Sequence, residues 1–549
     1  MHLKTKFFES LRISFAPAHH AKKRSFVKMT PGHGHVNGTG SGSSSHKKHT
    51  LETLRPILIK LTLSCSVPIP AHASQDGSGS PDLATNASTS ENFNVPDIPT
   101  PSVKPRGPPL NSEELTILFD HLADAEFTAN TSHHAQIGAC LTSLRMSGWD
   151  MSSQALTIAS GLFLKKALPV HVPQTLSKEE IKNQHADDEW SKVFPIEGDE
   201  GYQGSLDLVG TGGDGHDTYN VSTTAAIVAA GVPGVRVCKH GARASSSSSG
   251  SADLLAALGV PLANLTPSTM PRLLPNSSFT FLFAQLFHPS MAPLAPIRRS
   301  LGFPTIFNVL GPLVNPARPK RSVMGVHSWG LGQTFAEALR ESNCERGWIV
   351  CGREGLDEIS PEGETDVWEL RDGVIKHLVI SPASFGLPAH PLAHVKSGTA
   401  AENACVARYL FEPKTHSGPI PKGPLSEAFT FTSSLDSKEY SIPAGTHLDA
   451  LLDYVLLQTA ALLYVAGKGA TLSHSVILAR SSLAFGGAIK ALDQLSTEAK
   501  RAGQAVESEQ HEREERELRR IYRKDDFYYS KDLRNRGGDP ADTTDVEGR

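Results

Sequence analysis

The sequence predicts an α/β protein with a small all-helical N-terminal part and a larger part built on a central, mostly parallel sheet flanked by helices. Two strand–loop–helix units follow each other directly, over residues 205–231 and 235–259. Short apolar runs at Phe279–Phe283, Val323–Val326 and Gly347–Cys351 supply further strands. Strands that alternate with helices are typical of a parallel sheet covered on both faces.

The first unit carries the most informative loop of the chain. An apolar run from Ser205 enters the sequence GTGGDG at Gly210–Gly215, and an alanine-rich helical run opens at NVST, Asn220–Thr223. Glycines let the backbone approach an anion, and a helix N-terminus turns unpaired N–H groups toward it. The same letters fit the GxGxxG dinucleotide pattern, but Lys239 ends the next apolar run where an acidic residue is expected, which suits a 2′-phosphate. The loop therefore predicts a phosphate site whose ligand the motif alone leaves open.

The second unit indicates another anion loop beside the first. Val235–Lys239 is a predicted strand, and a loop with five serines at Ser245–Ser249 leads into a helical run after Gly250. In a parallel sheet the two loops emerge at the same edge. A serine run is otherwise typical of a flexible linker. Its position between a strand and a helix favours a ligand with two separated phosphates, to which Lys239 adds a point charge.

Composition divides the chain into four segments. They are a basic extension predicted to be disordered (1–50), a helical domain with loop insertions at 85–110 and 168–204 (51–204), an α/β domain (205–495), and a charged tail predicted to be disordered or a solvated helix (496–549). Within the helical domain a first helical segment is expected at Pro56–Leu63. A polar N-cap with acids in the first turn starts the next helix at Asn111. Further helical runs occupy His134–Met146 and Ser153–Lys166.

Charge and residue types narrow the classes of partner. A net charge of −4 gives no sign of nucleic-acid binding. No apolar run approaches the roughly 18 residues that a membrane helix needs. The six cysteines lack CxxC spacing, which indicates free buried thiols in a reducing compartment. The basic first fifty residues partly fit a mitochondrial presequence, but Lys and His outnumber Arg, so a cytoplasmic location is expected.

Further motifs complete an ordered set along the chain. In order, they are GTGGDG (Gly210–Gly215), NVST (Asn220–Thr223), KHG (Lys239–Gly241), GSAD (Gly250–Asp253), FHPSM (Phe287–Met291), Arg298, TIFNVLGPLVNP (Thr305–Pro316) and GLDEISPEG (Gly355–Gly363). This set resembles the anthranilate phosphoribosyltransferases of tryptophan biosynthesis, in a fungal-type form with terminal extensions. The resemblance covers roughly Leu110 to Leu495. Any one motif is weak, whereas the ordered set is specific.

The resemblance implies a reaction, an architecture and an assembly. The amine of anthranilate displaces pyrophosphate from C1 of 5-phosphoribosyl 1-diphosphate, giving N-(5-phosphoribosyl)anthranilate. The active site is expected in the cleft between the two domains, with residues 285–310 returning to the helical domain, and the chain is expected to form a homodimer. Such a reaction depends on positioning and on stabilising the charge of the leaving group. No residue is therefore assigned as a general acid or base.

The resemblance also implies which residues bind the phosphoribosyl diphosphate donor. They are Gly210, Gly213, Asp214, Thr218, Asn220, Val221, Ser222 and Thr223 from the first loop, and Lys239, His240, Gly241, Ala242, Arg243, Ala244, Ser245, Ser246, Ser247 and Ser251 from the second.

Anthranilate and a metal ion are assigned by the same resemblance. Gly210, His288 and Arg298 are expected to contact anthranilate, because a guanidinium fork matches a carboxylate. A purely structural role is the alternative for His288 and for His240. Mg²⁺ is the expected cofactor, with Ser222, Asp357 and Glu358 as its ligands. Adjacent carboxylates in a glycine-flanked loop suit a cation that also bridges phosphate oxygens.

One departure from the family pattern stands in the second loop. Ala242 follows KHG where many members carry Asn, so one polar contact with substrate is lost and weaker acceptor binding is expected. The enzymatic alternative is a pyrimidine-nucleoside phosphorylase of the same superfamily, and the other alternative is a non-catalytic scaffold. The metal carboxylates and Arg298 argue against both alternatives. Phosphorolysis needs no diphosphate–metal site, and a non-catalytic scaffold needs no intact set of substrate and metal ligands.

Overall fold

The computed structural model describes residues 49–64, 110–172, 202, 204–244, 247–413 and 420–535, with side chains up to Glu517. Nearly all of the predicted basic extension and most of the two predicted loop insertions lie outside these residues. From Leu51 onward the described residues belong to one compact unit.

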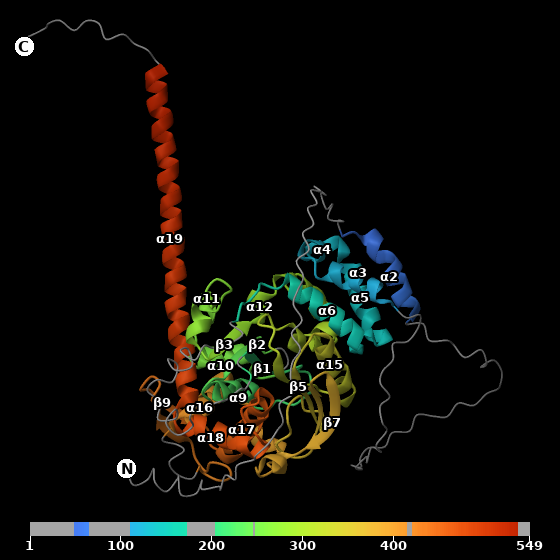
Figure 1. Cartoon of the computed structure of the whole chain (residues 1–549), viewed down its shortest axis with the longest axis vertical. Coiled ribbons are helices and arrows are strands. Elements are labelled where there is room, and N and C mark those ends of the chain that lie inside the picture. Colours follow the sequence, from blue (N-terminus) through green and yellow to red (C-terminus); the bar gives the residue numbers. More distant parts are fainter. Residues whose placement is uncertain are drawn as a thin grey trace, which may run out of the picture. The chain divides into compact units, whose positions relative to one another are not determined.

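A seven-stranded sheet forms the centre of the α/β part, in the order β3-β2-β1-β4-β5-β6-β7 (Figure 1). Its strands are β1 (Ser205–Gly210), β2 (Arg236–Gly241), β3 (Phe279–Phe283), β4 (Arg321–Gly325), β5 (Arg346–Gly352), β6 (Thr365–Arg371) and β7 (Val374–Ile380). The five strands from β3 to β5 are parallel, and β6 and β7 add an antiparallel edge. The predicted fold class, a mostly parallel sheet flanked by helices, is confirmed.

The hairpin β6–β7 was not predicted, although its turn carries a sequence signal. Asp372 and Gly373 connect the two strands and both have positive φ, 53° and 77°. Two positive φ values in a two-residue loop define the type I′ turn that Asp-Gly favours. A second, separate hairpin pairs β8 (Phe429–Thr432) with β9 (Glu439–Ile442).

Helices cover the sheet and form the N-terminal part. The N-terminal helices are α2 (Leu51–Ser64), α3 (Ser112–Leu122), α4 (Ala125–Ala129), α5 (His134–Ser147) and α6 (Ser153–Lys166). Those of the α/β part are α9 (Val221–Ala230), α10 (Ser251–Ala257), α11 (Met270–Leu273), α12 (Ala284–Phe287), α13 (Leu294–Leu301), α14 (Ile306–Val309), α15 (Trp329–Glu341), α16 (Ala400–Phe411), α17 (Leu448–Ala466), α18 (Leu472–Ala484) and α19 (Gly487–Asn535).

The ends of the N-terminal helices follow from their sequences. At the start of α3, the Asn111 side chain accepts from the N–H of Glu114 and the Glu114 carboxylate accepts from the N–H of Asn111, both at 2.8 Å. This capping box satisfies two backbone donors and explains why the predicted start holds. The predicted helix at Ser153–Lys166 matches α6, whereas the helix expected at Pro56–Leu63 already begins at Leu51 and carries Pro56 inside it.

Each face of the sheet has its own apolar core, as the alternation along β5 illustrates. Trp348 and Val350 lie in the core that includes α9 and α17. Ile349 and Cys351 lie in the other core, which joins the sheet to α15 and to the N-terminal helices. The apolar side chains of α13 and α14 belong to this second core, so the segment that contains them packs against the N-terminal helices.

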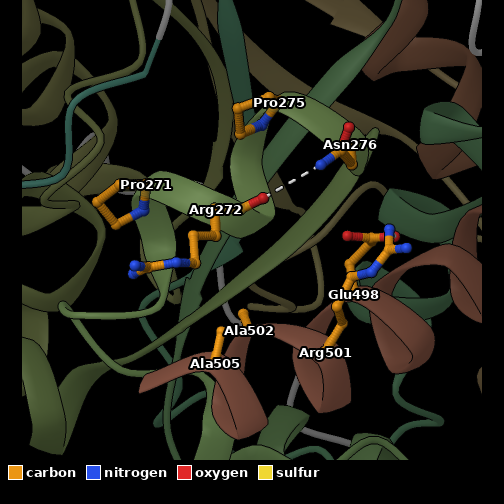
Figure 2. A pocket seen from close by; sticks show the side chains of 8 residues that line it. All are labelled: Pro271, Arg272, Pro275, Asn276, Glu498, Arg501, Ala502 and Ala505. Atoms are coloured by element: carbon orange, nitrogen blue, oxygen red, sulfur yellow. Dashed lines mark hydrogen bonds and ion pairs between the residues drawn. The ribbon is translucent and has the colours of Figure 1, made fainter. Parts of the chain in front are cut away.

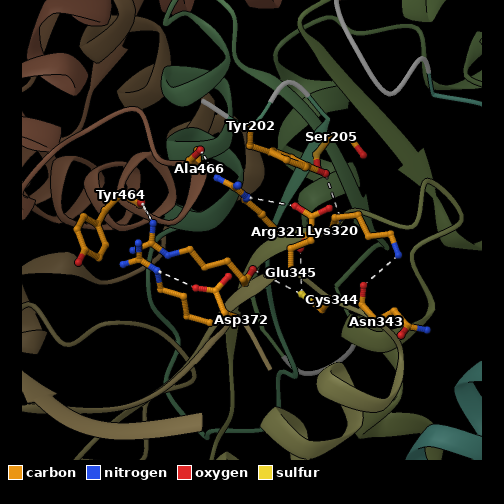
Figure 3. A network of polar contacts seen from close by, with 12 residues as sticks. Tyr202, Ser205, Lys320, Arg321, Asn343, Cys344, Glu345, Asp372, Tyr464 and Ala466 are labelled. Carbon is orange, nitrogen blue, oxygen red and sulfur yellow. Dashed lines mark hydrogen bonds and ion pairs between the residues drawn. The ribbon is translucent and has the colours of Figure 1, made fainter. Parts of the chain in front are cut away.

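The helix α17 contradicts the expectation about apolar runs long enough to cross a membrane. By length and composition its 19 residues are apolar enough to cross a membrane, so the expectation that no such run exists was wrong. Most of α17 is buried inside the protein, packed against α9 and α18. Its last turn is held by Arg321, whose Nη1 donates to the carbonyl of Ala466 at 2.8 Å (Figure 3).

The boundary predicted for the charged tail was also wrong. The helix α19 starts at Gly487 and continues without a break to Asn535 (Figure 1). Within the predicted tail, Ala499 and Ala502 are still buried against the α/β part, whereas the side chains from Glu507 to Glu517 are exposed. The solvated helix therefore begins about three turns later than its charge pattern suggested.

Candidate active site

The centre of the site lies where the strand order of the sheet reverses. The two neighbouring strands β1 and β4 end side by side at Gly210 and Gly325, which are partners in the parallel register. In open α/β sheets, ligands bind outside the carboxyl ends of strands at this kind of reversal. Both positions are glycine because Asp357, after β5, passes directly over them. A Cβ on Gly210 would lie 2.2 Å from Oδ2 of Asp357, and one on Gly325 would lie 1.5 Å from its carbonyl oxygen.

The first glycine loop binds this aspartate through its backbone. The N–H of Gly212 donates to Oδ2 of Asp357 at 2.6 Å. Gly212, Gly213 and Gly215 have φ of 69°, 81° and 76°, a region that favours glycine. The predicted donor residue Asp214 accepts from the N–H of His216 at 3.1 Å and faces Asp357. The structure thus brings the GTGGDG loop and the predicted metal carboxylates together.

The two predicted metal carboxylates are surrounded by protein but keep part of their surface open to solvent. Burial raises the pKa of Asp357 to about 7, and the negative charge of Asp214 raises it as well. Burial also raises the pKa of Glu358 well above its usual value, with the charge of Asp357 as the second cause. Acidic groups held this close favour a cation beside them, because a positive charge stabilises their ionised forms.

The predicted donor residue Lys239 lies beneath the first loop. Its side chain is 1% exposed. Its ammonium donates to the carbonyl of Leu208 and, at 3.3 Å, to the hydroxyl of Ser222. Burial lowers the pKa of Lys239, and the nearby Asp207, Glu358 and Asp357 oppose this effect. The strand was predicted to end at Lys239, which was wrong. The strand β2 continues two residues further, through His240 to Gly241.

The buried carboxylate of Asp207 completes this arrangement below the site. Its Oδ2 accepts from Nδ2 of Asn315 at 2.8 Å, and the same nitrogen donates to the carbonyl of Cys238. Burial raises the pKa of Asp207 to about 6, while the charge of Lys239 lowers it. Asn315 thus connects the neighbouring strands β1 and β2.

The helix α9 begins within the NVST motif. Asn220 is its N-cap and Ser222 is its second helical residue. The side chains of Val221 and Thr223 are buried, which leaves their backbone for a ligand. The Ser222 hydroxyl is partly exposed and lies beside Lys239. The charges of Asp357 and Glu358 act to raise the pKa of this lysine.

The second loop is tied to the first by side chains of the first. Nδ2 of Asn220 donates to the carbonyl of Ser249 at 2.6 Å, and Asp217 accepts from the N–H of Ser248 at 2.9 Å. Nδ2 of Asn403, from α16, donates to Oδ1 of Asn220 at 2.9 Å. The two predicted phosphate loops therefore form one connected wall at the edge of the sheet.

The rest of the predicted second loop is open to solvent. Ala242, Arg243, Ala244 and Ser247 are exposed, Gly241 and Ser251 are partly buried, and Ser245 and Ser246 lie outside the described residues. The Arg243 guanidinium is exposed, and its Nη1 donates to Asp253 at 2.9 Å. The Asp253 carboxylate also accepts from the N–H groups of Ala244 and Gly250, which fixes the start of α10.

The residues predicted for anthranilate fall into two groups. His288 packs edge-on against His240, with ring centroids 5.0 Å apart, and both are buried. Burial lowers their pKa values to about 4 and about 3, so both imidazoles are neutral at pH 7. The guanidinium of Arg298 lies 5.3 Å from the ring centre of Phe307. Burial lowers the pKa of Arg298.

Two residues of α17 that contact the loop after β5, which carries Asp357 and Glu358, were not predicted from the sequence. The Tyr454 hydroxyl donates to Oε2 of Glu358, and Nε2 of Gln458 donates to the carbonyl of Ile359 at 2.7 Å. The signal available was a polar pair spaced four residues apart on an otherwise apolar helix. Asp217 and Asn403, which hold the second loop, lie in no motif.

The donor set fits Mg²⁺ rather than a metal with a full protein cage. Among the residues that the structure describes, no three His, Cys, Asp or Glu side chains converge on one point. Mg²⁺ is commonly held by one or two carboxylates and completes its octahedron with water and phosphate oxygens. Asp357 and Glu358 are such a pair, next to a loop built for phosphate.

A separate cavity of about 430 Å³ lies between α19 and the consecutive short helices α11 and η4 (Leu274–Asn276) (Figure 2). Its arginines are already paired, Arg272 with Glu509 and Arg501 with Glu498. The cavity contains none of the residues predicted to bind substrate or metal.

Comparison with known proteins gives one consistent result. Residues 202–419 match the family model described as "Glycosyl transferase family, a/b domain". The anthranilate phosphoribosyltransferase of Schizosaccharomyces pombe is 44% identical over 292 residues, which cover 53% of this chain and 74% of the relative. That of Saccharomyces cerevisiae is 33% identical over 380 residues, 67% of this chain and 87% of the relative. The solved structure of the Saccharomyces cerevisiae enzyme in complex with PRPP and Mg has a TM-score of 0.57 and 30% identity, over 71% of this chain and 94% of that one. The fold, the two anion loops and these relatives together show that the chain belongs to the anthranilate phosphoribosyltransferase family.

Proposed function

We propose that this protein transfers the phosphoribosyl group of 5-phosphoribosyl 1-diphosphate to the amine of anthranilate, releasing pyrophosphate in tryptophan biosynthesis. The bond between C1 of the ribose and the diphosphate oxygen breaks, a bond forms from C1 to the anthranilate nitrogen, and this nitrogen releases one proton. The observation that carries the proposal is the contact of Asp357 with Gly212, which places an acidic metal loop directly over a phosphate loop.

The chain's residues support this chemistry by binding and orientation. The backbone of the GTGGDG loop and the N-terminus of α9 offer N–H groups to the donor phosphates. Asp357 and Glu358 would hold Mg²⁺, which would neutralise charge on the diphosphate. Lys239 adds positive charge below the loop. Stabilising a leaving group in this way requires no strong base.

The acceptor is proposed to lie near Arg298. Its guanidinium packs over Phe307, which leaves a planar cation beside an aromatic ring, and such a pair suits an aromatic carboxylate. The neutral His240 of the KHG motif and His288 of the FHPSM motif are buried and pack edge-on against each other. We assign neither imidazole as an acid.

The assay that tests the function follows the fluorescence of anthranilate. With the full-length protein, the donor and Mg²⁺, the fluorescence of anthranilate falls as product forms. A folded sample without turnover would refute the proposal. Thymidine phosphorolysis, measured beside it, tests the pyrimidine-nucleoside phosphorylase alternative, for which no activity is expected.

The metal assignment has its own test. The double variant Asp357→Ala with Glu358→Ala is expected to lower kcat and to weaken the dependence on Mg²⁺. Removing both carboxylates takes away the protein's charged ligands while the phosphate loops remain. A double variant with the wild-type response to Mg²⁺ would contradict the assignment.

We further propose a homodimer formed through the N-terminal helices. Ile59 and Leu63 on α2 and Met146 on α5 are 54%, 60% and 66% exposed, an apolar surface that suits a second copy of the chain. Light scattering coupled to size exclusion tests it, and Leu63→Glu is expected to give monomers. A cytoplasmic location is proposed as well, and imaging of the C-terminally tagged full chain distinguishes it from mitochondrial import.

A further inference from the structure

Tyr454 lies fully buried in α17, where this helix passes the metal carboxylates. Its hydroxyl donates a hydrogen bond to Oε2 of Glu358 and accepts one from the side chain of Thr218. Glu358 belongs to the loop after β5, and Thr218 belongs to the loop after β1. A single hydroxyl therefore joins the carboxylate proposed for Mg²⁺ to the loop proposed for the donor.

The next turn of α17 holds the same segment. Nε2 of Gln458 donates to the carbonyl of Ile359 at 2.7 Å, and its Oε1 accepts from the N–H of Ile359 at 3.4 Å. Tyr454 and Gln458 are four residues apart and therefore lie on one face of the helix. Together they fix the side chain of Glu358 and the backbone directly after it.

The far end of α17 is anchored to the sheet. Arg321 on β4 donates to the carbonyl of Ala466 at 2.8 Å, and Arg346, its register partner on β5, donates to the carbonyl of Tyr464 at 2.9 Å (Figure 3). Cations at a helix C-terminus also interact favourably with the helix dipole. The C-terminal end of the helix that carries Tyr454 is thus fixed to the sheet, and a metal ligand needs rigid support of this kind.

The hydrogen bond from Tyr454 is the contact that orients the Glu358 carboxylate. Within the described part of the chain, no other side chain donates a hydrogen bond to Glu358. Asp357, Asp214 and Lys239 act on it through their charges.

We propose that Tyr454 is a positioning residue that binds one oxygen of Glu358 and keeps the other for the cation on the donor diphosphate. Its second bond, from Thr218, keeps the carboxylate in a fixed relation to the donor loop. This role rests on the proposed function of the site. Outer partners of metal ligands fix ligand orientation, and their loss typically weakens metal binding about 10- to 100-fold.

The variant Tyr454→Phe removes the hydroxyl and keeps the ring. Mn²⁺ binding, followed by electron paramagnetic resonance with the donor present and the acceptor absent, is expected to weaken at least about tenfold. In turnover, the KM for Mg²⁺ rises while the KM for anthranilate stays constant. Tyr464→Phe is the matched control in the same helix. Its ring keeps its contact with Arg346, 4.5 Å from the ring centre, so metal binding is expected to stay at the wild-type level.

A double-mutant cycle separates positioning from a general structural effect. Because Tyr454 acts through Glu358, adding Tyr454→Phe to Glu358→Gln is expected to cause no further loss of Mn²⁺ affinity. Additive losses, or wild-type Mn²⁺ affinity in Tyr454→Phe, would overturn the proposal.

Two safeguards keep the test decisive. If Tyr454→Phe does not fold, Thr218→Val and Thr218→Ser are compared by Mn²⁺ binding without the donor. Only the Val variant is expected to bind more weakly, and equal affinities would overturn the proposal. The Mn²⁺ measurement needs no acceptor and no turnover. If the wild type transfers no phosphoribosyl group, the proposed function is refuted, but the Mn²⁺ affinities of the variants can still be compared.

Discussion

The backbone N–H of Gly212 donates a 2.6 Å hydrogen bond to Oδ2 of Asp357, and this bond joins loops 145 positions apart in the chain. Its existence depends on Gly210 and Gly325, which leave room for Asp357 above the ends of two neighbouring strands. The contact defines the geometry of the site, because it sets where acidic charge meets the phosphate loop.

Gly325→Ala tests this close approach. The added methyl group would lie 1.5 Å from the carbonyl oxygen of Asp357, so the metal loop must move. We expect a higher Mg²⁺ requirement and a loss of about 1–3 kcal/mol in the free energy of unfolding, the usual cost of overpacking. Steady-state kinetics against Mg²⁺ and urea unfolding measure the two effects. Gly330→Ala, where no atom lies within 4 Å of the new methyl, is the control. An unchanged Mg²⁺ requirement in Gly325→Ala would contradict this account.

Arg298→Ala tests the acceptor site. Losing a charged hydrogen bond worth about 1.5–3 kcal/mol raises the KM for anthranilate about 10- to 100-fold, and the KM for the donor changes little. The neighbouring Arg299 is exposed, and Arg299→Ala is expected to behave as the wild type. Equal effects of the two substitutions on the anthranilate KM would remove Arg298 from the site.

Ala242→Asn tests the departure from the family pattern. Ala242 is exposed on the second loop, and its carbonyl accepts from the N–H of Ala252 at 3.1 Å. A new amide contact worth about 0.5–1.5 kcal/mol lowers the anthranilate KM about 2- to 10-fold. A gain in turnover of several hundredfold would instead mean that the native site is crippled.

The buried pair His240 and His288 predicts sensitivity to acid. Their folded-state pKa values are about 3 and about 4, below the 6.5 of the unfolded chain. The unfolded state therefore binds more protons as pH falls below 6.5, and stability present above that pH is lost toward pH 4. His288→Gln is expected to reduce this loss by about 1–3 kcal/mol, measured as the difference between urea unfolding at pH 7.5 and at pH 4.5. An identical pH dependence in variant and wild type would show that His288 ionises freely when folded.

Local signals in the sequence were enough for much of the fold. The capping box at Asn111, the apolar run Phe279–Phe283 and the glycine loop before Asn220 each specify their structure within a few residues, so the corresponding elements were predictable. The Asp372–Gly373 turn carries an equally local signal, although the hairpin that it forms was not predicted. The 19-residue apolar run of α17 was also present in the sequence, but composition cannot distinguish a core helix from a membrane helix.

The sequence by itself determined that two phosphate loops follow two strands and that an acidic pair and an arginine accompany them. Only the tertiary structure decided which of these meet. It placed Asp357 over Gly210 and Gly325, turned Arg243 toward Asp253, and set Tyr454 against Glu358. The physical reason is that these contacts join segments that are far apart in the chain. They arise from the order in which the strands pair and the depth at which helices pack, and no local periodicity encodes either.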